Sequence, residues 1–497
     1  MRQATQSMLQ RWGIGLLVLF LSACLFHQGL ANEKYFEDEG AYLAGSYYYR
    51  LVKEGRLNDV DWFYLGSYDH LQVGRWMIGA ALDARGLRLS DSTRELEAWY
   101  GADGIRQTEI DPSEVGRLFA ARMVMMFGGA IGCWAIFIIG KQMVGPITGL
   151  AAALLLGGSP LYLTHARRAM PDDWVIAFGL IGLTCVFFVA KRLPLRRGYW
   201  FHLTRTLPGI GVAGIAFGLS AATKLSGISI LIAVLVNAGL LLALSAPWRV
   251  TGPTHTVMKR WGIVILGACV VAAGTFVAAH PFFYARPKLP PINPDQPTLV
   301  VDGQARNAKW IDDYVRPLAD AGIGERLRYL VQYRQSVLDD PKIQDRFPKD
   351  KLPTTASRIA AMLHDGWGKH LYAANFGFTS SFSSFLVGTL VLSGLIWCGN
   401  EGTRLWKMGM LPIPWMLIIW FAVEGAILTR ELSLNWDRYY LGWITITALL
   451  SAVGIGGPIS SMGRRLVLLP PMPPEERPNS LKATTQTAGP TPLPGHP

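Results

Sequence analysis

The sequence predicts an all-α membrane protein that crosses the bilayer about ten times. The 497-residue chain is 51% hydrophobic and only 16% charged, and its mean hydropathy is positive. That composition is far from the composition of a soluble enzyme. Apolar segments also recur along the chain, each near the length that crosses about 30 Å of hydrocarbon. Short charged segments separate most of them.

Ten apolar segments qualify as candidate spans, although a few are short. The first ends near Leu21-Ser22-Ala23-Cys24, which looks like a lipobox, so a cleaved lipoprotein signal is an alternative. We favour an uncleaved helix, because many more spans follow and the acidic cluster behind it needs an anchor. The candidate spans lie at about 12–30, 118–139, 146–163, 174–190, 209–222, 225–244, 261–279, 380–398, 411–428 and 439–455.

Two long polar loops, 31–116 and 281–379, interrupt the series of spans. The first loop is rich in Tyr and Trp, which suits the lipid headgroup region, and an amphipathic interfacial helix is expected over 74–87. The second loop opens with prolines and is expected to form amphipathic helices near 324–338 and 354–364. We divide the chain into a transmembrane body, 1–457, and a Pro-rich, disordered cytoplasmic tail, 458–497.

The charges indicate a topology. Net charge is +12, but the basic residues lie in short segments between apolar runs, so nucleic-acid binding is not expected. They concentrate on the side of the N-terminus, which predicts a multi-pass protein of the inner (plasma) membrane with both termini cytoplasmic and both long loops outside. The five cysteines lie in or at the ends of apolar runs, where packing is their expected role.

Three adjacent carboxylates, Glu37, Asp38 and Glu39, follow the first span. A carboxylate held at a membrane boundary can act as a general base beside a lipid-borne substrate. The alternative is a solvated helix start, where the helix dipole favours acids.

Three outward segments carry charges where few are expected. They contain Arg167, Arg168 and Asp172; Lys224; and Arg438. Such residues can simply snorkel or pair at helix ends. Because all three segments lie on the same face as Asp38, we expect a common site. Glu424, about a turn inside its predicted span, is a further functional candidate without an assigned role.

A site with one carboxylate and several cations suits glycosyl transfer from a sugar-bearing lipid phosphate. The cations bind the phosphate, which leaves without a proton donor when its charge is stabilised. The acceptor hydroxyl has a high pKa and needs a base. Glycosidases differ because they need a second carboxyl group as acid.

Several motifs resemble those of the polytopic glycosyltransferases with the GT-C fold, specifically the protein O-mannosyltransferase and aminoarabinose-transferase group. Asp38-Glu39 matches the acidic pair that follows the first span of that family. Arg167 and Asp172 have the family's Arg-to-Asp spacing, which Arg168 and Asp173 share. The remaining matches are His70 in a segment that lacks the family's prolines, Lys224 in a Thr-Lys turn, and Arg438-Tyr439 before the last span.

The resemblance implies that Asp38 is the catalytic base and Glu39 its helper. It implies substrate-binding roles for His70, Arg167, Arg168, Asp172, Lys224, Arg438 and Tyr439. The second loop is too short for the carbohydrate-binding module of the eukaryotic mannosyltransferases. Some relatives use a divalent ion, but His70, His280, His364 and His370 show no ligand spacing, so neither a metal site nor a cofactor is predicted.

The expected function is transfer of a hexosyl or pentosyl group from a polyprenyl-phosphate donor to a hydroxyl or amine acceptor on a lipid, glycan or protein. Its partners are the donor, the acceptor and membrane lipids. The alternative is a lipid or sugar transporter (flippase), which would place polar residues near mid-bilayer and often shows repeats. Here the charges gather at one face and no repeat is visible. A non-catalytic scaffold would tolerate neutralisation of Asp38.

Overall fold

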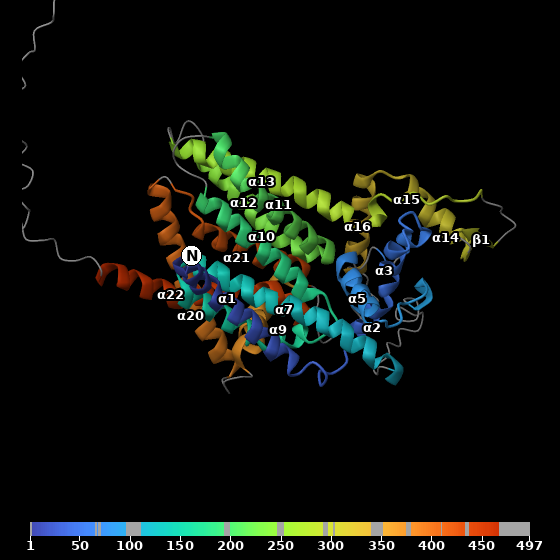
Figure 1. Cartoon of the computed structure of the whole chain (residues 1–497), viewed down its shortest axis with the longest axis horizontal. Helices are drawn as coiled ribbons and strands as arrows, with labels where there is room; N and C mark the ends of the chain where they lie inside the picture. The colour runs from blue at the N-terminus through green and yellow to red at the C-terminus, as the bar shows by residue number, and fades with distance from the viewer. Residues whose placement is uncertain are drawn as a thin grey trace, which may run out of the picture.

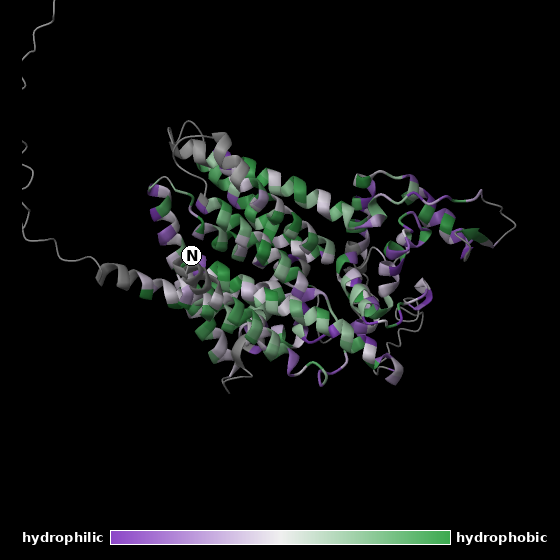
Figure 2. Ribbon diagram, in the orientation of Figure 1, coloured by the Kyte–Doolittle hydropathy of each residue, from purple (hydrophilic) through white to green (hydrophobic). Residues whose placement is uncertain are grey.

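Long helices lie side by side through most of the molecule, and a smaller region of short elements covers one end of them (Figure 1). Hydrophobic residues dominate the long helices, whereas hydrophilic residues gather at the covered end (Figure 2). This arrangement comes from a computed structural model, which describes residues 2–64, 67, 71–95, 111–192, 199–245, 253–291, 297–301, 304–338, 351–373, 379–408, 410–432 and 437–466.

Seven helices in the described part of the chain are long and apolar enough to cross a membrane, or up to eight if a bent pair counts as one span. The polytopic all-α class is therefore confirmed, but the count of about ten is not. The seven are α7 (Val115–Met143), α10 (Asp172–Arg192), α11 (Tyr199–Thr223), α12 (Ile228–Leu244), α13 (Pro253–Ala278), α20 (Ser380–Lys407) and α22 (Leu441–Leu466).

Two further predicted spans are helical but are not both long and apolar enough to count as membrane-crossing helices. One is α1 (Arg2–His27), whose described apolar part, Gly13–His27, is short. The other is α21 (Pro414–Glu431), which contains Glu424, Arg430 and Glu431. The N-terminus and the end of α22 lie at the same end of the bundle, opposite the covered end (Figure 1).

The segment predicted as one span over 146–163 is instead a bent pair. Helix α8 (Pro146–Gly157) and helix α9 (Pro160–Ala166) meet at 71°. The Ser159 side chain caps α9 by accepting a hydrogen bond from the Tyr162 N–H at 3.5 Å, and Pro160 follows at the first helical position. Such a break is tolerated at membrane depth where it is buried in protein, and Ser159 is fully buried.

Both long loops contribute to the covered end. The first supplies α2 (Glu37–Ala44), α3 (Ser46–Lys53), η1 (Val60–Phe63) and α5 (Gln72–Ala84). The second supplies η4 (Pro281–Phe283), strands β1 (Thr298–Val301) and β2 (Gln304–Asn307), α14 (Ala308–Trp310), η5 (Ile311–Val315), α15 (Arg316–Asp320) and α16 (Ile323–Leu338). They share one apolar core, which includes Tyr47, Trp62, Phe282, Ile311 and Leu330. We call these elements the outer unit.

Arg326 on α16 ties the outer unit together. Its side chain is fully buried. The guanidinium donates hydrogen bonds to four backbone carbonyls, those of Phe282, Ala285, Ala319 and Ala321. It thereby satisfies carbonyls at the ends of two short elements that have few partners of their own.

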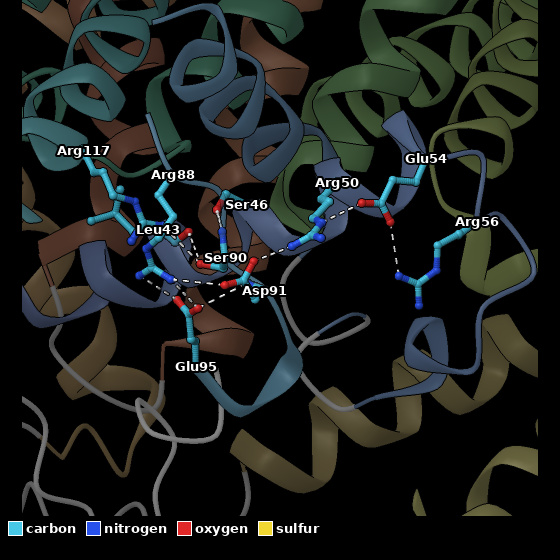
Figure 3. Close-up of polar contacts among 10 residues, drawn as sticks. All are labelled: Leu43, Ser46, Arg50, Glu54, Arg56, Arg88, Ser90, Asp91, Glu95 and Arg117. Atoms are coloured by element: carbon cyan, nitrogen blue, oxygen red, sulfur yellow. Dashed lines mark hydrogen bonds and ion pairs between the residues drawn. The ribbon is translucent and has the colours of Figure 1, made fainter. Parts of the chain in front are cut away.

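Ionic contacts attach α3 to the start of α7 through the segment that follows α5 (Figure 3). Arg88 binds Glu95 and Glu114, and Arg50 on α3 binds Asp91. Ser90 is buried, and its backbone N–H donates to the Ser46 hydroxyl at 3.1 Å while its own hydroxyl accepts from Arg117 at 3.1 Å. The exposed pairs contribute little each, but the buried serine contacts fix the path of the segment.

The helices expected in the loops are present. The first corresponds to α5, and the others to α16 and to α18 (Thr355–Ala361). Helix α18 continues as the π-helix η7 (Met362–Ala373), which packs against α20. A short antiparallel hairpin, β1 with β2, was not expected. Helix α22 runs to Leu466, and the rest of the predicted tail, 467–497, lies outside the described residues.

Candidate active site

The acidic cluster forms the first turn of α2. Phe36 has an extended backbone, and its N–H donates to Glu39 Oε2 at 2.9 Å, so the Glu39 carboxylate closes the start of the helix. Acidic residues in this position are favoured by the helix dipole. The three carboxylates nevertheless have different surroundings, and only Glu39 is fully buried.

Glu39 is held by a buried arginine. Arg122 on α7 donates from Nε to Oε1 and from Nη2 to Oε2, both at 2.8 Å, which is a bidentate pair. The Ala169 N–H adds a third contact to Oε1 at 2.6 Å. Glu39 therefore joins α2 to α7 and to the segment before α10. This geometry suits a residue that positions its neighbour Asp38.

Arg122 is a site residue that the sequence analysis did not select. Besides Glu39, it donates to the carbonyls of Leu30 at 3.1 Å and Glu33 at 2.8 Å. It therefore fixes the chain between the first span and α2. Arg122 could have been selected from the sequence, because an arginine inside a predicted span is itself a functional candidate.

Asp38 pairs with Arg438, 400 residues away in the sequence. Arg438 belongs to η8 (Asp437–Tyr440), the short turn that opens α22, and its guanidinium lies 5.7 Å from the centre of the Tyr439 ring. The side chains of Asp38 and Arg438 are 15% and 23% exposed. The turn that opens the last span therefore places the Arg438 guanidinium in contact with Asp38, the predicted base.

A second ion pair joins Asp172 to Lys224. Lys224 Nζ lies 2.5 Å from Asp172 Oδ1, and the Asp172 side chain is 5% exposed. Asp172 opens α10, and Lys224 is the extended residue between α11 and η3 (Leu225–Gly227). The second oxygen of Asp172, Oδ2, is buried without a hydrogen-bond partner.

The two ion pairs lie close together around Tyr42 of α2. Burial raises the pKa of the Tyr42 hydroxyl, and the nearby carboxylates of Asp172 and Asp38 raise it further. Arg438 interacts electrostatically with both carboxylates. We refer to Asp38, Arg438, Asp172 and Lys224 as the charged row, because acids and bases alternate along it. Four segments far apart in the sequence supply its members.

Arg167 and Arg168 bind other partners. Arg167 donates from Nε to the Phe26 carbonyl at 3.2 Å and from Nη2 to the Leu25 carbonyl at 3.0 Å, so it caps the end of α1. The Arg168 guanidinium lies 4.6 Å from the centre of the Phe36 ring, and its Nε lies 3.7 Å from Glu33 Oε1. Arg167 therefore holds the end of α1, and Arg168 contacts the segment that leads into α2.

Three other candidates complete the set. His70 lies outside the described residues. His165, not selected from the sequence, is 2% exposed in the last turn of α9, and its Nδ1 has no hydrogen-bond partner in the structure. It interacts electrostatically with Asp172, Lys224 and Arg438. Glu424 of α21 is buried against Gly442 of α22, where an added Cβ would lie 2.1 Å from Glu424 Oε1.

The part of the site that the structure describes shows no set of metal ligands. Within the described ranges, no group of three or more His, Cys, Asp or Glu side chains could hold a metal ion. The two carboxylates of the charged row each bind a cationic side chain instead. A divalent ion needs several oxygen or nitrogen ligands directed at one point.

Comparison with known proteins supports the fold. No protein-family model matches the sequence, and a search of curated proteins found no relative. Among solved structures, the archaeal oligosaccharyltransferase AglB from Archaeoglobus fulgidus, in complex with an inhibitory peptide and a dolichol-phosphate, is 14% identical with a TM-score of 0.50, and the match covers 92% of this chain and 52% of that chain.

Two further structures are similar. The Archaeoglobus fulgidus oligosaccharyltransferase in complex with Zn and sulfate is 13% identical with a TM-score of 0.50, over 90% of this chain and 50% of that chain. ArnT from Cupriavidus metallidurans, bound to undecaprenyl phosphate, is 12% identical with a TM-score of 0.44, over 92% and 63%. The chain spans about half the length of the AglB structures. The likeness to AglB confirms the expected GT-C fold.

Proposed function

We propose that this protein is an integral-membrane glycosyltransferase. It would move a sugar from a polyprenyl-phosphate donor to a hydroxyl or amine on a lipid, glycan or protein. The charged row is the observation that supports this most, because it brings two carboxylates and two cations together at the covered end of a GT-C bundle. That combination meets the needs of a reaction with an anionic leaving group and a weak nucleophile.

Asp38 is the proposed base. The acceptor oxygen forms a bond to the anomeric carbon while the bond from that carbon to the phosphate oxygen breaks. Asp38 takes the acceptor proton, and the polyprenyl phosphate leaves with the electron pair. Arg438 and Lys224 stabilise the charge on the departing phosphate, and Asp172 orients Lys224.

The other predicted residues act around this centre. Glu39 and Arg168 hold the start of α2 in place and Arg167 holds the end of α1, which makes them positioning residues. Tyr439 contacts the guanidinium of Arg438 and would line the donor side. His70 keeps its predicted substrate-binding role. No step requires a metal ion.

We place the site on the periplasmic or outer face of the inner membrane, with both termini in the cytoplasm. In the sequence, basic residues concentrate in the segments on the same side of the predicted spans as the N-terminus, which is the cytoplasmic pattern. A donor carried by a polyprenyl phosphate would approach through the lipid.

Transfer assays test the proposal. Membranes that contain the protein would be incubated with radiolabelled polyprenyl-phosphate sugars, hexosyl and pentosyl, together with lipid, glycan and protein acceptor fractions. We expect one donor to be consumed and its label to appear in one acceptor fraction, with and without EDTA. Consumption of no donor in any combination would contradict the transferase.

A transporter is the second candidate, and the bent pair α8–α9 favours it, because broken helices are frequent in transporters. Proteoliposomes loaded with a labelled polyprenyl-phosphate sugar separate the two functions. A transporter would move the lipid between leaflets without releasing its sugar, whereas the transferase would release the sugar to an acceptor.

A further inference from the structure

Both cations of the charged row are already engaged. Arg438 binds Asp38, and Lys224 binds Asp172. A phosphate that enters the row must therefore compete with a carboxylate for at least one cation. Binding of an anionic donor is therefore linked to whether Asp38, the proposed base, is paired with Arg438.

The two pairs differ in how easily they open. Asp172 is 5% exposed and Lys224 19% exposed. Asp38 and Arg438 are 15% and 23% exposed, so water can solvate their separated charges more readily. The Asp38–Arg438 pair is therefore the one that an incoming anion separates at lower cost.

Arg438 has a second carboxylate within electrostatic range. Asp172 interacts with Arg438, and its Oδ2 is buried without a hydrogen-bond partner. Asp172 can thus retain Arg438 in the site after the bond to Asp38 is lost.

We propose that the Asp38–Arg438 pair is a latch that the donor phosphate opens, so that Asp38 becomes available as a base only when donor is bound. The latch rests on the proposed function. Before donor binds, the Arg438 guanidinium donates to Asp38 Oδ2 and so occupies an oxygen that would accept the proton. Once the phosphate takes Arg438, Asp38 Oδ2 no longer accepts from the guanidinium and can accept the acceptor proton. Donor binding therefore precedes proton transfer from the acceptor.

Binding of a short-chain polyprenyl phosphate to the purified full-length protein in detergent tests the latch without any chemical step. Asp38→Asn keeps the shape of the side chain but removes the competitor for Arg438. We expect it to bind the lipid phosphate about fivefold more tightly than wild type, the size expected when a partly exposed ion pair no longer competes. Arg438→Gln should bind more weakly than wild type.

Glu37→Gln is the matched control, because it removes a carboxylate from the same helical turn. Its affinity should equal that of wild type, which separates loss of a specific competitor from a general loss of negative charge. Asp38→Ser provides a second variant without the carboxylate, and thermal melts confirm that each variant is folded.

The outcomes distinguish the latch from the function on which it rests. Tighter binding by Asp38→Asn and Asp38→Ser, with Glu37→Gln unchanged, supports the latch. Equal or weaker binding by both folded Asp38 variants overturns the latch and leaves the transferase standing. If wild type does not bind the lipid phosphate, the donor assignment fails and the latch fails with it.

Discussion

Arg122 and Glu39 form a buried bidentate ion pair across 83 residues, with both N···O distances at 2.8 Å. The Arg122 side chain is 4% exposed and the Glu39 side chain is fully buried. The pair connects α7 to the turn that carries Asp38. The position of the proposed base therefore depends on a contact that does not itself face the substrate.

Glu39→Gln and Arg122→Met should each destabilise the protein. Each leaves one buried charge without its partner, which costs about 3–5 kcal/mol. The double variant should lose less than the sum of the single variants, because no lone charge remains. Melting temperatures of the purified proteins measure this. Additive losses would show that the pair is not coupled.

Arg326→Met should loosen the outer unit. The variant leaves the carbonyls of Phe282 and Ala285 without their donor, and each unsatisfied buried group costs about 1–3 kcal/mol. Arg286 still donates to the carbonyls of Ala319 and Ala321. Hydrogen exchange of η4 and α15 should accelerate. Arg328→Met on the same helix is the control, because Arg328 is exposed and its loss should change nothing. Unchanged hydrogen exchange of η4 and α15 in Arg326→Met would show that Arg326 does not hold these elements together.

Asp61 should make stability depend on pH. Its Oδ2 accepts from the Tyr47 hydroxyl at 2.6 Å and from Arg306 Nη2 at 2.5 Å, yet burial raises its pKa from 3.8 to about 6. Arg306 and Arg56 oppose the shift, and Asp59 adds to it. The folded protein thus retains a proton that the unfolded chain releases. The stabilising effect is complete below about pH 4 and is lost as pH rises through about 6.

Melting temperatures of wild type and Asp61→Asn between about pH 4 and pH 7 test this dependence. The wild type should lose stability relative to Asp61→Asn across that interval. Asp83→Asn, which removes a half-buried carboxylate bound to Lys53, should follow wild type. A constant difference between wild type and Asp61→Asn would show that Asp61 does not titrate there.

Lys224→Met should weaken donor use. The change removes a cation from the charged row and leaves Asp172 buried without it. We expect KM for the donor to rise roughly tenfold or more, as for loss of a charge-assisted contact to phosphate. Lys224→Arg keeps the charge and should remain closer to wild type. Initial rates over a range of donor concentrations measure this, and an unchanged KM in Lys224→Met would remove Lys224 from the donor site.

The sequence predicts most long helices because apolar length is a strong local signal. The bend between α8 and α9 had a signal that was missed, because Gly157-Gly158-Ser159-Pro160 interrupts the apolar run with a capping serine and a proline at the first helical position. The β1–β2 hairpin had a signal that was missed. Asp302-Gly303 between two strand-like runs is a common hairpin turn sequence.

The charged row was accessible from sequence because Asp38, Asp172, Lys224 and Arg438 each border an apolar run. The direction in which each of these charged side chains points could not be predicted from the sequence. Arg167 has the expected spacing to Asp172, yet it caps α1. Its partner there, the carbonyl of Phe26, lies 141 residues earlier in the sequence. Such partners are set by how distant helices pack, and no local pattern encodes them.

The rate of sugar transfer by Asp38→Asn tests the central claim most directly. It should be measured beside Asp38→Glu and the matched control Glu37→Gln, at equal amounts of folded protein and with the donor that wild type consumes. We predict that Asp38→Asn loses roughly a hundredfold or more, as removal of a general base requires, while Glu37→Gln transfers at about the wild-type rate. Transfer by Asp38→Asn at the wild-type rate would contradict the assignment of Asp38 as the base.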